Sequence, residues 1–271
     1  MNKNYLDKFT LKNKKAYVFG GCGLIGKEIT EILIAAGAKT YVFDNNYIAG
    51  KELKKKFNKK NFSFIKSNIA NTNNINSSFN KYIKNFGCPD IFINCSYPAT
   101  KDWARSSFKK NTLKSLRDNV DLHLNSYAWW GYKICEQMKK NKIKGSVVLL
   151  SSIYGILGQN MNIYKNTKMS ENMNYSIIKG GITNFARQLA SYYGKSGIRV
   201  NALCPGGISG HIKGTKNKQS RKFIKNYSDH CPLQRLAKAN EIAYAILFLC
   251  VDASSYITGT NFMVDGGWSA I

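Results

Sequence analysis

The stretch Ala16-Tyr17-Val18-Phe19-Gly20-Gly21-Cys22-Gly23-Leu24-Ile25-Gly26 decides the fold of this chain. Its apolar start predicts a strand, and the glycines predict a turn into a helix over residues 24–36. Glycine lets a backbone adopt positive φ and approach a ligand closely. The helix N-terminus that follows offers N–H groups and a positive dipole end to a pyrophosphate. The glycine spacing fits G-x-G-x-x-G, which alone is a weak pattern because packing also explains glycines.

The residue that ends the next strand strengthens this interpretation. A second apolar run, residues 40–43, is followed by Asp44, about twenty residues after the glycines. An acid there accepts hydrogen bonds from the adenosine ribose and repels a 2′-phosphate. Asn45 and Asn46 provide no arginine for such a phosphate. We therefore expect NAD as the cofactor rather than NADP, with a merely solvated Asp44 as the alternative.

Composition limits the class of protein. The chain has 271 residues, 44% of them hydrophobic, which suits one α/β domain over residues 1–271. The start has no apolar signal segment, and the longest apolar run, residues 243–251, is too short to cross a membrane. Seven scattered cysteines without a C-x-x-C pair predict a reducing, cytoplasmic location. No cluster has metal-ligand spacing, so we expect no metal.

The net charge of +26 has two interpretations. A positive field attracts anionic substrates, acidic proteins or nucleic acid. The alternative, which we favour, is a lysine-rich composition spread over solvated faces. No RNA-binding signature or zinc knuckle is present, so no nucleic-acid partner is expected.

Strand-like and helix-like segments alternate along the whole chain. This alternation predicts a Rossmann-like doubly wound parallel sheet of about seven strands with helices on both faces. The expected strands are residues 16–19, 40–43, 62–66, 91–93, 146–150, 199–203 and 261–264. The expected helices are residues 24–36, 49–58, 75–86, 113–140, 175–193 and 241–251. Two segments that follow predicted strands interrupt this alternation. We expect an insertion over residues 158–174 and a lid over residues 206–232, both on the substrate side.

Candidate catalytic groups come from a tyrosine and a lysine one helical turn apart. A tyrosine that moves a proton at neutral pH needs its pKa lowered by about three units, roughly 4 kcal/mol, through nearby positive charge. The pattern Tyr-x-x-x-Lys begins at four tyrosines: Tyr47, Tyr97, Tyr164 and Tyr175. Position favours the last pair, Tyr175 and Lys179, because it opens a long amphipathic helix that leads to Pro205. Tyr164 with Lys168 is the serious rival.

These motifs, in this order, resemble the short-chain dehydrogenase/reductase family in its compact, single-domain branch. The resemblance covers almost the whole chain and implies an NAD(P)-dependent enzyme that acts on a secondary alcohol or ketone. It rests on the glycine-rich turn, Asn94, Ser151-Ser152-Ile153-Tyr154-Gly155, Tyr175 with Lys179, Pro205-Gly206, and Val264-Asp265-Gly266-Gly267.

The resemblance implies a role for each matching residue. Tyr175 is the expected general acid/base, Lys179 lowers its pKa and holds the nicotinamide ribose, and Ser152 binds the substrate oxygen, with Ser151 as the alternative. His123 falls where the family has a catalytic asparagine, and Asn125 is the alternative for that role. The expected cofactor contacts are Gly20, Gly21, Cys22, Gly23, Leu24, Ile25, Gly26, Asp44, Asn45, Asn68, Ile69, Asn94, Tyr175, Lys179, Pro205, Gly206 and Ile208.

The chain departs from the family pattern in places. Phe19 precedes the glycines where threonine is common, and Asn68 replaces an aspartate usually near the adenine. The stretch Asn94-Cys95-Ser96-Tyr97 stands where the family has Asn-Asn-Ala-Gly. The spacing of Gly20, Gly23 and Gly26 resembles the extended, sugar-nucleotide branch, which keeps an epimerase or dehydratase as an alternative.

The inserted loop and the stretch from Tyr97 to Trp103 resemble dehydrogenases of bacterial surface-sugar and flagellin-glycan pathways, including those for legionaminic-type acids. We therefore expect a small polar substrate, such as an anionic sugar, bound in part by Lys165 and Lys168 of the insertion and by Lys213, Lys216 and Lys218 of the lid segment.

The resemblance also implies a homo-oligomer, a tetramer or dimer. The predicted helices over residues 113–140 and 175–193 carry more apolar residues than one sheet face needs, such as Trp129, Trp130, Ile182 and Phe185, so we expect an exposed patch that forms an interface. Two alternatives stay open: a 3-oxoacyl carrier-protein reductase, and a catalytically silent binding protein that kept the fold.

Overall fold

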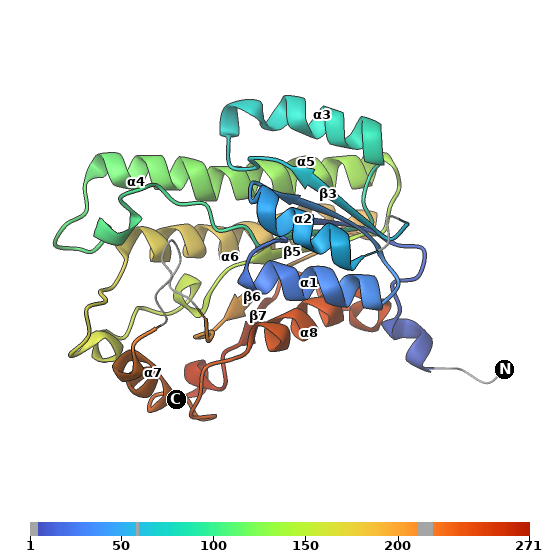
Figure 1. The fold of residues 1–271 in the computed structure, drawn as a ribbon. Coiled ribbons are helices and arrows are strands. Elements are labelled where there is room, and N and C mark those ends of the chain that lie inside the picture. The colour runs from blue at the N-terminus through green and yellow to red at the C-terminus, as the bar shows by residue number, and fades with distance from the viewer. Residues whose placement is uncertain (1–4, 58–59, 211–218) are drawn as a thin grey trace.

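The computed structural model describes residues 5–57, 60–210 and 219–271, and it contains one seven-stranded parallel sheet (Figure 1). The strand order is β3-β2-β1-β4-β5-β6-β7, and every neighbouring pair is parallel. This confirms the predicted doubly wound sheet. The strands are β1 (Lys15–Phe19), β2 (Lys39–Asp44), β3 (Phe62–Lys66), β4 (Ile91–Asn94), β5 (Ser146–Leu150), β6 (Arg199–Pro205) and β7 (Asn261–Val264).

Helices cover both faces of the sheet (Figure 1). One apolar cluster joins the sheet to α3 (Ile75–Phe86), α5 (Ser126–Lys140) and α6 (Met173–Tyr193). The other joins its opposite face to α1 (Leu24–Ala35), α2 (Tyr47–Lys56) and α8 (Ala239–Cys250). The described chain also contains α4 (Leu113–Asn119) and α7 (Arg221–Ser228).

Most strands are largely apolar because both of their faces are buried, whereas the edge strand β3 alternates between buried and half-buried residues. In β1, Ala16 and Val18 pack into one cluster, whereas Tyr17 and Phe19 pack into the other. Strands of a parallel sheet covered by helices show this continuous hydrophobicity instead of alternation. Phe19 stacks edge-on against Trp130, with ring centroids 4.7 Å apart, which explains an aromatic residue where the family pattern has threonine.

The predicted helix over residues 113–140 is interrupted. Between α4 and α5, residues Val120–Asn125 form a π-helical segment. Such segments insert an extra residue into a helical turn and are frequent at functional sites. The other predicted helices are found with shifts of at most two residues at their ends, which is ordinary for helix boundaries.

The strand order places the site. The chain moves outward in one direction from β1 to β3 and in the other from β4 to β7, so adjacent strands β1 and β4 form the switch point. Ligands of such sheets bind beyond the carboxyl ends of the strands at this point. Among the described helices, none has the length and apolar character needed to span a membrane.

Candidate active site

The glycine-rich turn lies directly at the switch point. Gly20 has φ +78°, and a Cβ there would lie 2.5 Å from the Cα of Ser96 on the neighbouring strand's loop. A Cβ on Gly26 would lie 2.0 Å from the carbonyl oxygen of Gly20. Side chains at either position would therefore open the turn. The close approach of these two backbones explains glycine here in physical terms.

The start of α1 is suited to a phosphate group. Gly23 is the N-cap residue and no side chain caps the helix. The first backbone N–H groups of a helix have no partner within it, and the helix dipole favours an anion at that end. The residues fit the pyrophosphate of a dinucleotide, which we expected from Gly21, Cys22, Gly23 and Leu24.

Asp44 stands beside this turn, as predicted. Its carboxylate accepts hydrogen bonds from the backbone N–H groups of Cys22, at 3.0 Å, and of Asn46, at 2.9 Å. The side chain is half-buried, whereas Asn45 is exposed. Each carboxylate oxygen has a second lone pair, so Asp44 can also accept from a ribose hydroxyl.

The remaining adenine-side residues differ in what they offer. The exposed Asn68 side chain accepts from the backbone N–H of Ala70, at 3.2 Å. Ile69 is buried, and its carbonyl accepts from the Trp130 indole at 2.8 Å. A buried carbonyl held in this way fixes the backbone that follows β3.

Asn94 provides an orphaned polar group at the centre of the site. It ends β4 and is fully buried, and its Oδ1 accepts from the Ser96 hydroxyl at 2.7 Å. Its Nδ2 has no hydrogen-bond partner among the described residues. An unsatisfied buried amide is costly, so this group fits a site that a polar ligand completes. Together with the glycine cradle, it supports a bound dinucleotide.

Ser152, Tyr175 and Lys179 come together where β5 ends and α6 begins. A hydrogen bond links Ser152 to Tyr175, and the Lys179 ammonium lies 5.6 Å from the centroid of the Tyr175 ring. Lys179 is buried and donates to the carbonyl of Leu150 at 2.9 Å. Asn172 caps α6 by accepting from the N–H of Tyr175, at 2.9 Å, which fixes the tyrosine in the first turn.

Two opposing effects act on the pKa of Tyr175 in the protein without ligands. Burial raises the pKa of Tyr175 above its usual value, and the hydrogen bond with Ser152 lowers it in part. In the protein alone, burial therefore outweighs the hydrogen bond with Ser152. The neighbouring serine, Ser151, donates its hydroxyl to the carbonyl of Lys179 at 2.9 Å, so it serves the backbone of α6.

Tyrosine rings surround the Lys179 ammonium on three sides. Its nitrogen lies 5.7 Å from the ring centroid of Tyr97 and 5.6 Å from that of Tyr127, in addition to Tyr175. A cation within about 6 Å of an aromatic face is attracted by the ring quadrupole. These contacts stabilise the positive charge of the buried ammonium.

His123 lies in the π-helical segment and faces the site. It is fully buried, with its ring 5.4 Å from that of Tyr97 and 5.1 Å from that of Tyr127. Asn125, the alternative, is exposed and donates to Asp121 at 3.0 Å. The geometry therefore brings His123 to the site and leaves Asn125 at the surface.

The rival pair does not share a helical face. Tyr164 ends the 3₁₀ turn Met161–Tyr164 and donates its hydroxyl to Gln159 at 3.0 Å, while Lys168 is exposed. Gln159 also donates to the carbonyl of Asn172 and to Ser176, at 2.8 and 2.9 Å. These hydrogen bonds tie the inserted segment to the start of α6.

Pro205, Gly206 and Ile208 lie at the carboxyl end of β6. The N–H of Gly206 donates to Val264 at 3.0 Å, and Ile208 forms a bridge with Ala237. Three lysines expected to bind an anionic substrate, Lys213, Lys216 and Lys218, lie outside the described residues.

An aromatic wall, made of Tyr97, Trp103 and Tyr154, stands around Tyr175. The ring centroids lie 5.9, 6.3 and 6.4 Å, respectively, from that of Tyr175. Sequence reasoning assigned no role to this wall. The available signal was Tyr97, a large side chain in a stretch where the family has glycine.

A cavity of about 440 Å³ lies at the opposite end of the sheet, near Lys14, Lys144 and Arg199. The helices α5, α6 and α8 end nearby. Cations complement the negative dipole at helix C-termini, so these charges have a structural explanation. In the described part of the chain, no group of three or more His, Cys, Asp or Glu residues could hold a metal ion.

Comparison with known proteins identifies the family. The family profile described as enoyl-(acyl carrier protein) reductase matches residues 23–269. The post-translational flagellin modification protein A of Campylobacter coli is 29% identical over 262 residues, covering 95% of this chain and 99% of that protein. The 3-oxoacyl-[acyl-carrier-protein] reductase of Chlamydia muridarum is 30% identical over 264 residues, covering 95% and 98%.

A solved structure agrees with these relatives. The short chain dehydrogenase of Leptospira borgpetersenii with bound NAD+ superimposes with a TM-score of 0.80 and 29% identity, covering 99% of this chain and 97% of that one. The chain belongs to the short-chain dehydrogenase/reductase family. It is an oxidoreductase that uses a nicotinamide dinucleotide.

Proposed function

We propose that this protein interconverts a secondary alcohol and a ketone with NAD as its cofactor, on a polar, sugar-type substrate of surface-glycan biosynthesis. The main support for this reaction is that Ser152, Tyr175 and Lys179 come together at the carboxyl end of β5. The flagellin modification protein of Campylobacter coli, similar over its whole length, supports the substrate class.

The bound nicotinamide supplies or accepts the hydride in this chemistry. Tyr175 moves the matching proton: its hydroxyl donates to the substrate oxygen in reduction and accepts from it in oxidation. Ser152 holds that oxygen by a hydrogen bond. Lys179 stabilises the tyrosinate that forms when the proton leaves, since its ammonium lies 5.6 Å from the Tyr175 ring.

In oxidation the proton that Tyr175 gains passes toward the interior of the protein in this proposal, and in reduction Tyr175 regains a proton from the same side. Tyr97 lies between Tyr175 and His123, with ring centroids 5.9 and 5.4 Å away. His123 relays the proton from this side, because an imidazole gains and loses protons near neutral pH. It takes the place of the asparagine that the family resemblance implies.

The choice of NAD over NADP rests on Asp44. Its carboxylate is fixed by two backbone N–H groups and faces no arginine in the residues that follow β2. A 2′-phosphate placed beside this carboxylate would meet a like charge, whereas ribose hydroxyls can donate to it.

Two segments at the carboxyl ends of strands border the substrate side. In the insertion over residues 158–174, Lys165 and Lys168 are exposed, which suits recognition of an anionic sugar. Asn226 of α7 donates to the carbonyls of Ile163 and Lys165, at 3.2 and 2.9 Å, so the described part of the 206–232 segment packs on the insertion. We infer that the two act together as a cover of the site.

We also propose that the enzyme is a cytoplasmic homo-oligomer, a tetramer or dimer. Of the residues expected in an exposed patch, Trp130 and Ile182 are in fact buried in the core, whereas Trp129 is 45% exposed. Tyr132, Ile177 and Tyr192 are exposed on the same pair of adjacent helices, α5 and α6 (Figure 1). Apolar surface of this kind is typical of interfaces.

A reduction of 3-oxoacyl groups is the second candidate, favoured by the similarity to the Chlamydia muridarum reductase. One screen separates the two. NADH absorbance is followed with a panel of keto sugars, sugar phosphates and nucleotide sugars, and with acetoacetyl thioesters. We expect turnover with a sugar of the panel. Turnover of the thioester alone, with NADPH, would assign the second function instead.

A further inference from the structure

Trp103 presents an apolar ring surface next to the reacting group. Its indole ring stands at 78° to the ring of Tyr175, with centroids 6.3 Å apart, and the residue is half-buried. A hydrogen bond joins the Trp103 side chain to the Tyr97 hydroxyl, which occupies the only polar group of the indole. A bound ligand would therefore contact the hydrocarbon face and edge of the indole.

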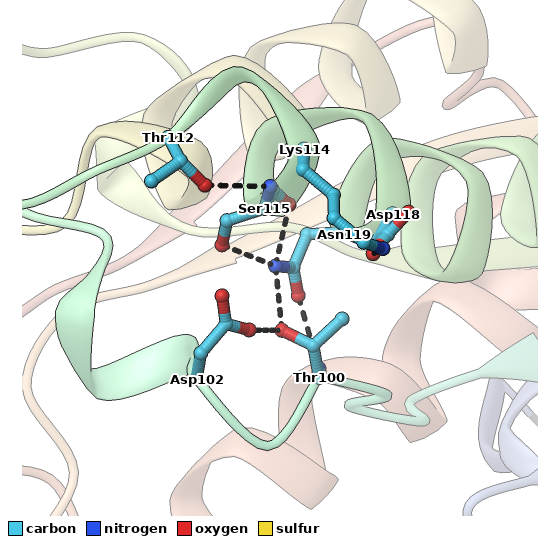
Figure 2. Close-up of polar contacts among 7 residues, drawn as sticks. All are labelled: Thr100, Asp102, Thr112, Lys114, Ser115, Asp118 and Asn119. Atoms are coloured by element: carbon cyan, nitrogen blue, oxygen red, sulfur yellow. Dashed lines mark hydrogen bonds and ion pairs between the residues drawn. The ribbon is translucent and has the colours of Figure 1, made fainter.

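A buried asparagine on α4 holds the loop that carries Trp103 (Figure 2). The Nδ2 of Asn119 donates to the Thr100 hydroxyl and to the carbonyl of Ser115, both at 2.8 Å. Its Oδ1 accepts from the backbone N–H of Thr100 at 3.1 Å. Thr100 in turn donates to Asp102, the residue directly before Trp103. Asn119 is fully buried, so these hydrogen bonds are shielded from water.

A second set of hydrogen bonds ties the same loop to the catalytic helix. Asn172, the cap of α6, donates to the carbonyl of Trp103 at 3.1 Å. Asn174 is fully buried and donates to the Ser106 hydroxyl at 3.0 Å. Tyr175 follows directly in the chain. The loop and the first turn of α6 are thereby held at a set separation, which preorganises the space beside Tyr175.

We infer that Trp103 determines substrate specificity by packing against the C–H face of a saturated ring, and that Asn119 is the positioning residue that holds it there. The inference rests on the proposed function, because a ketone held by Ser152 and Tyr175 must place its carbon frame among the rings of the aromatic wall. A pyranose has the matching chemistry: an apolar face of C–H groups and a polar rim. Ligand sites combine such apolar walls with a few fixed polar groups.

Two matched probes test the inference without knowledge of the natural substrate. Tetrahydropyran-4-one is a cyclic ether ketone, and 4-methoxybutan-2-one is its ring-opened counterpart with the same carbon and oxygen atoms. Binding of each to the full-length protein with saturating NAD+, which cannot reduce a ketone, is measured by ligand-observed NMR titration. We expect tighter binding of the cyclic probe to the natural protein, and a loss of about tenfold in Trp103→Ala. The affinity for the acyclic probe should change less than twofold.

Two further variants complete the design. Lys101→Ala changes an exposed residue of the same loop and should leave both probes unaffected. Thr100→Val keeps the shape of the side chain but removes the hydroxyl that contacts Asn119 and Asp102. We expect Thr100→Val to weaken binding of the cyclic probe about threefold, in the same direction as Trp103→Ala. NADH affinity, measured by its fluorescence, should be the same in all variants.

The outcomes separate the inference from the proposed reaction. Equal losses for both probes in Trp103→Ala, or no preference of the natural protein for the cyclic probe, would overturn the role of Trp103. Unchanged affinity of Thr100→Val for the cyclic probe would overturn the positioning role of Asn119. Trp103-dependent binding without turnover of any ketone would support the inference and count against the proposed reaction.

Discussion

Replacing Asp44 by alanine tests how the site chooses its cofactor. The carboxylate accepts from the N–H groups of Cys22 and Asn46. The N–H of the exposed Asn46 can turn to water, whereas that of half-buried Cys22 loses its partner, which costs about 1 kcal/mol. For a domain of this size we expect the melting temperature to fall by roughly 2–4 °C.

The effect on the cofactor should be larger than the effect on stability. Two unit charges at contact repel by about 4 kcal/mol at an effective dielectric of 20, and the half-exposed position of Asp44 screens part of this. We take about 1.4 kcal/mol as the remaining penalty, which corresponds to tenfold. Asp44→Ala should therefore bind NADPH about ten times more tightly than the natural protein does, and NADH more weakly because a ribose contact is lost.

Asp44→Asn is the matched control, since it removes the charge but keeps an oxygen that accepts from one of the two N–H groups. It should recover most of the lost melting temperature while it still relaxes the discrimination between cofactors. Kd values come from titrations that follow the fluorescence of NADH and NADPH. A natural protein that prefers NADPH, or an unchanged ratio in both variants, would refute the reasoning.

Three further predictions follow from the site and the surface. Tyr175→Phe should lower kcat by roughly 10²–10⁴-fold with little change in NADH affinity, whereas Tyr164→Phe, which loses a hydrogen bond to Gln159, should keep turnover. Steady-state kinetics with the substrate from the screen decide, and the reverse pattern would reject Tyr175 as the acid/base. Light scattering should give an oligomeric mass for the natural protein and a smaller one for Trp129→Asp; a monomeric natural protein would contradict the proposed interface. Arg235 holds the pKa of Glu241 down to about 2, so this carboxylate stabilises the fold above about pH 4.5, its unfolded value, and the stabilisation is lost as pH falls toward 2. Glu241→Gln should therefore lower the melting temperature slightly at pH 7 and by less at pH 3. A difference in melting temperature that does not depend on pH would argue against this ion pair.

Local sequence determined the framework of the protein. Most strands are continuous apolar runs because both sheet faces are covered, and this signal can be recognised in each segment by itself. The glycines of the first turn can also be recognised in the sequence. A side chain on Gly26 would clash with the nearby backbone of Gly20, and one on Gly20 would clash with the backbone of Ser96, beyond the adjacent strand. The strands, the class of fold and the place of the cofactor could therefore be predicted from spacing alone.

The membership of the site could be predicted only in part. Four Tyr-x-x-x-Lys patterns are equivalent as strings, and the fold separates them: Tyr175 opens α6 beside Ser152, whereas Tyr164 ends a short turn held by Gln159. Likewise His123 and Asn125 lie two residues apart. The π-helical segment rotates the first inward and leaves the second at the surface.

Tertiary structure alone decided the burial and the partners of the remaining residues. Trp129 and Trp130 are adjacent in sequence, yet one is 45% exposed and the other lies in the core, because a helix turns successive side chains about 100° apart. The aromatic wall assembles Tyr97 and Trp103, from the segment after β4, with Tyr154, from the segment after β5. Asn119 meets Thr100 only when α4 packs back on the loop before it. Such contacts depend on distances between segments, which no spacing along the chain records.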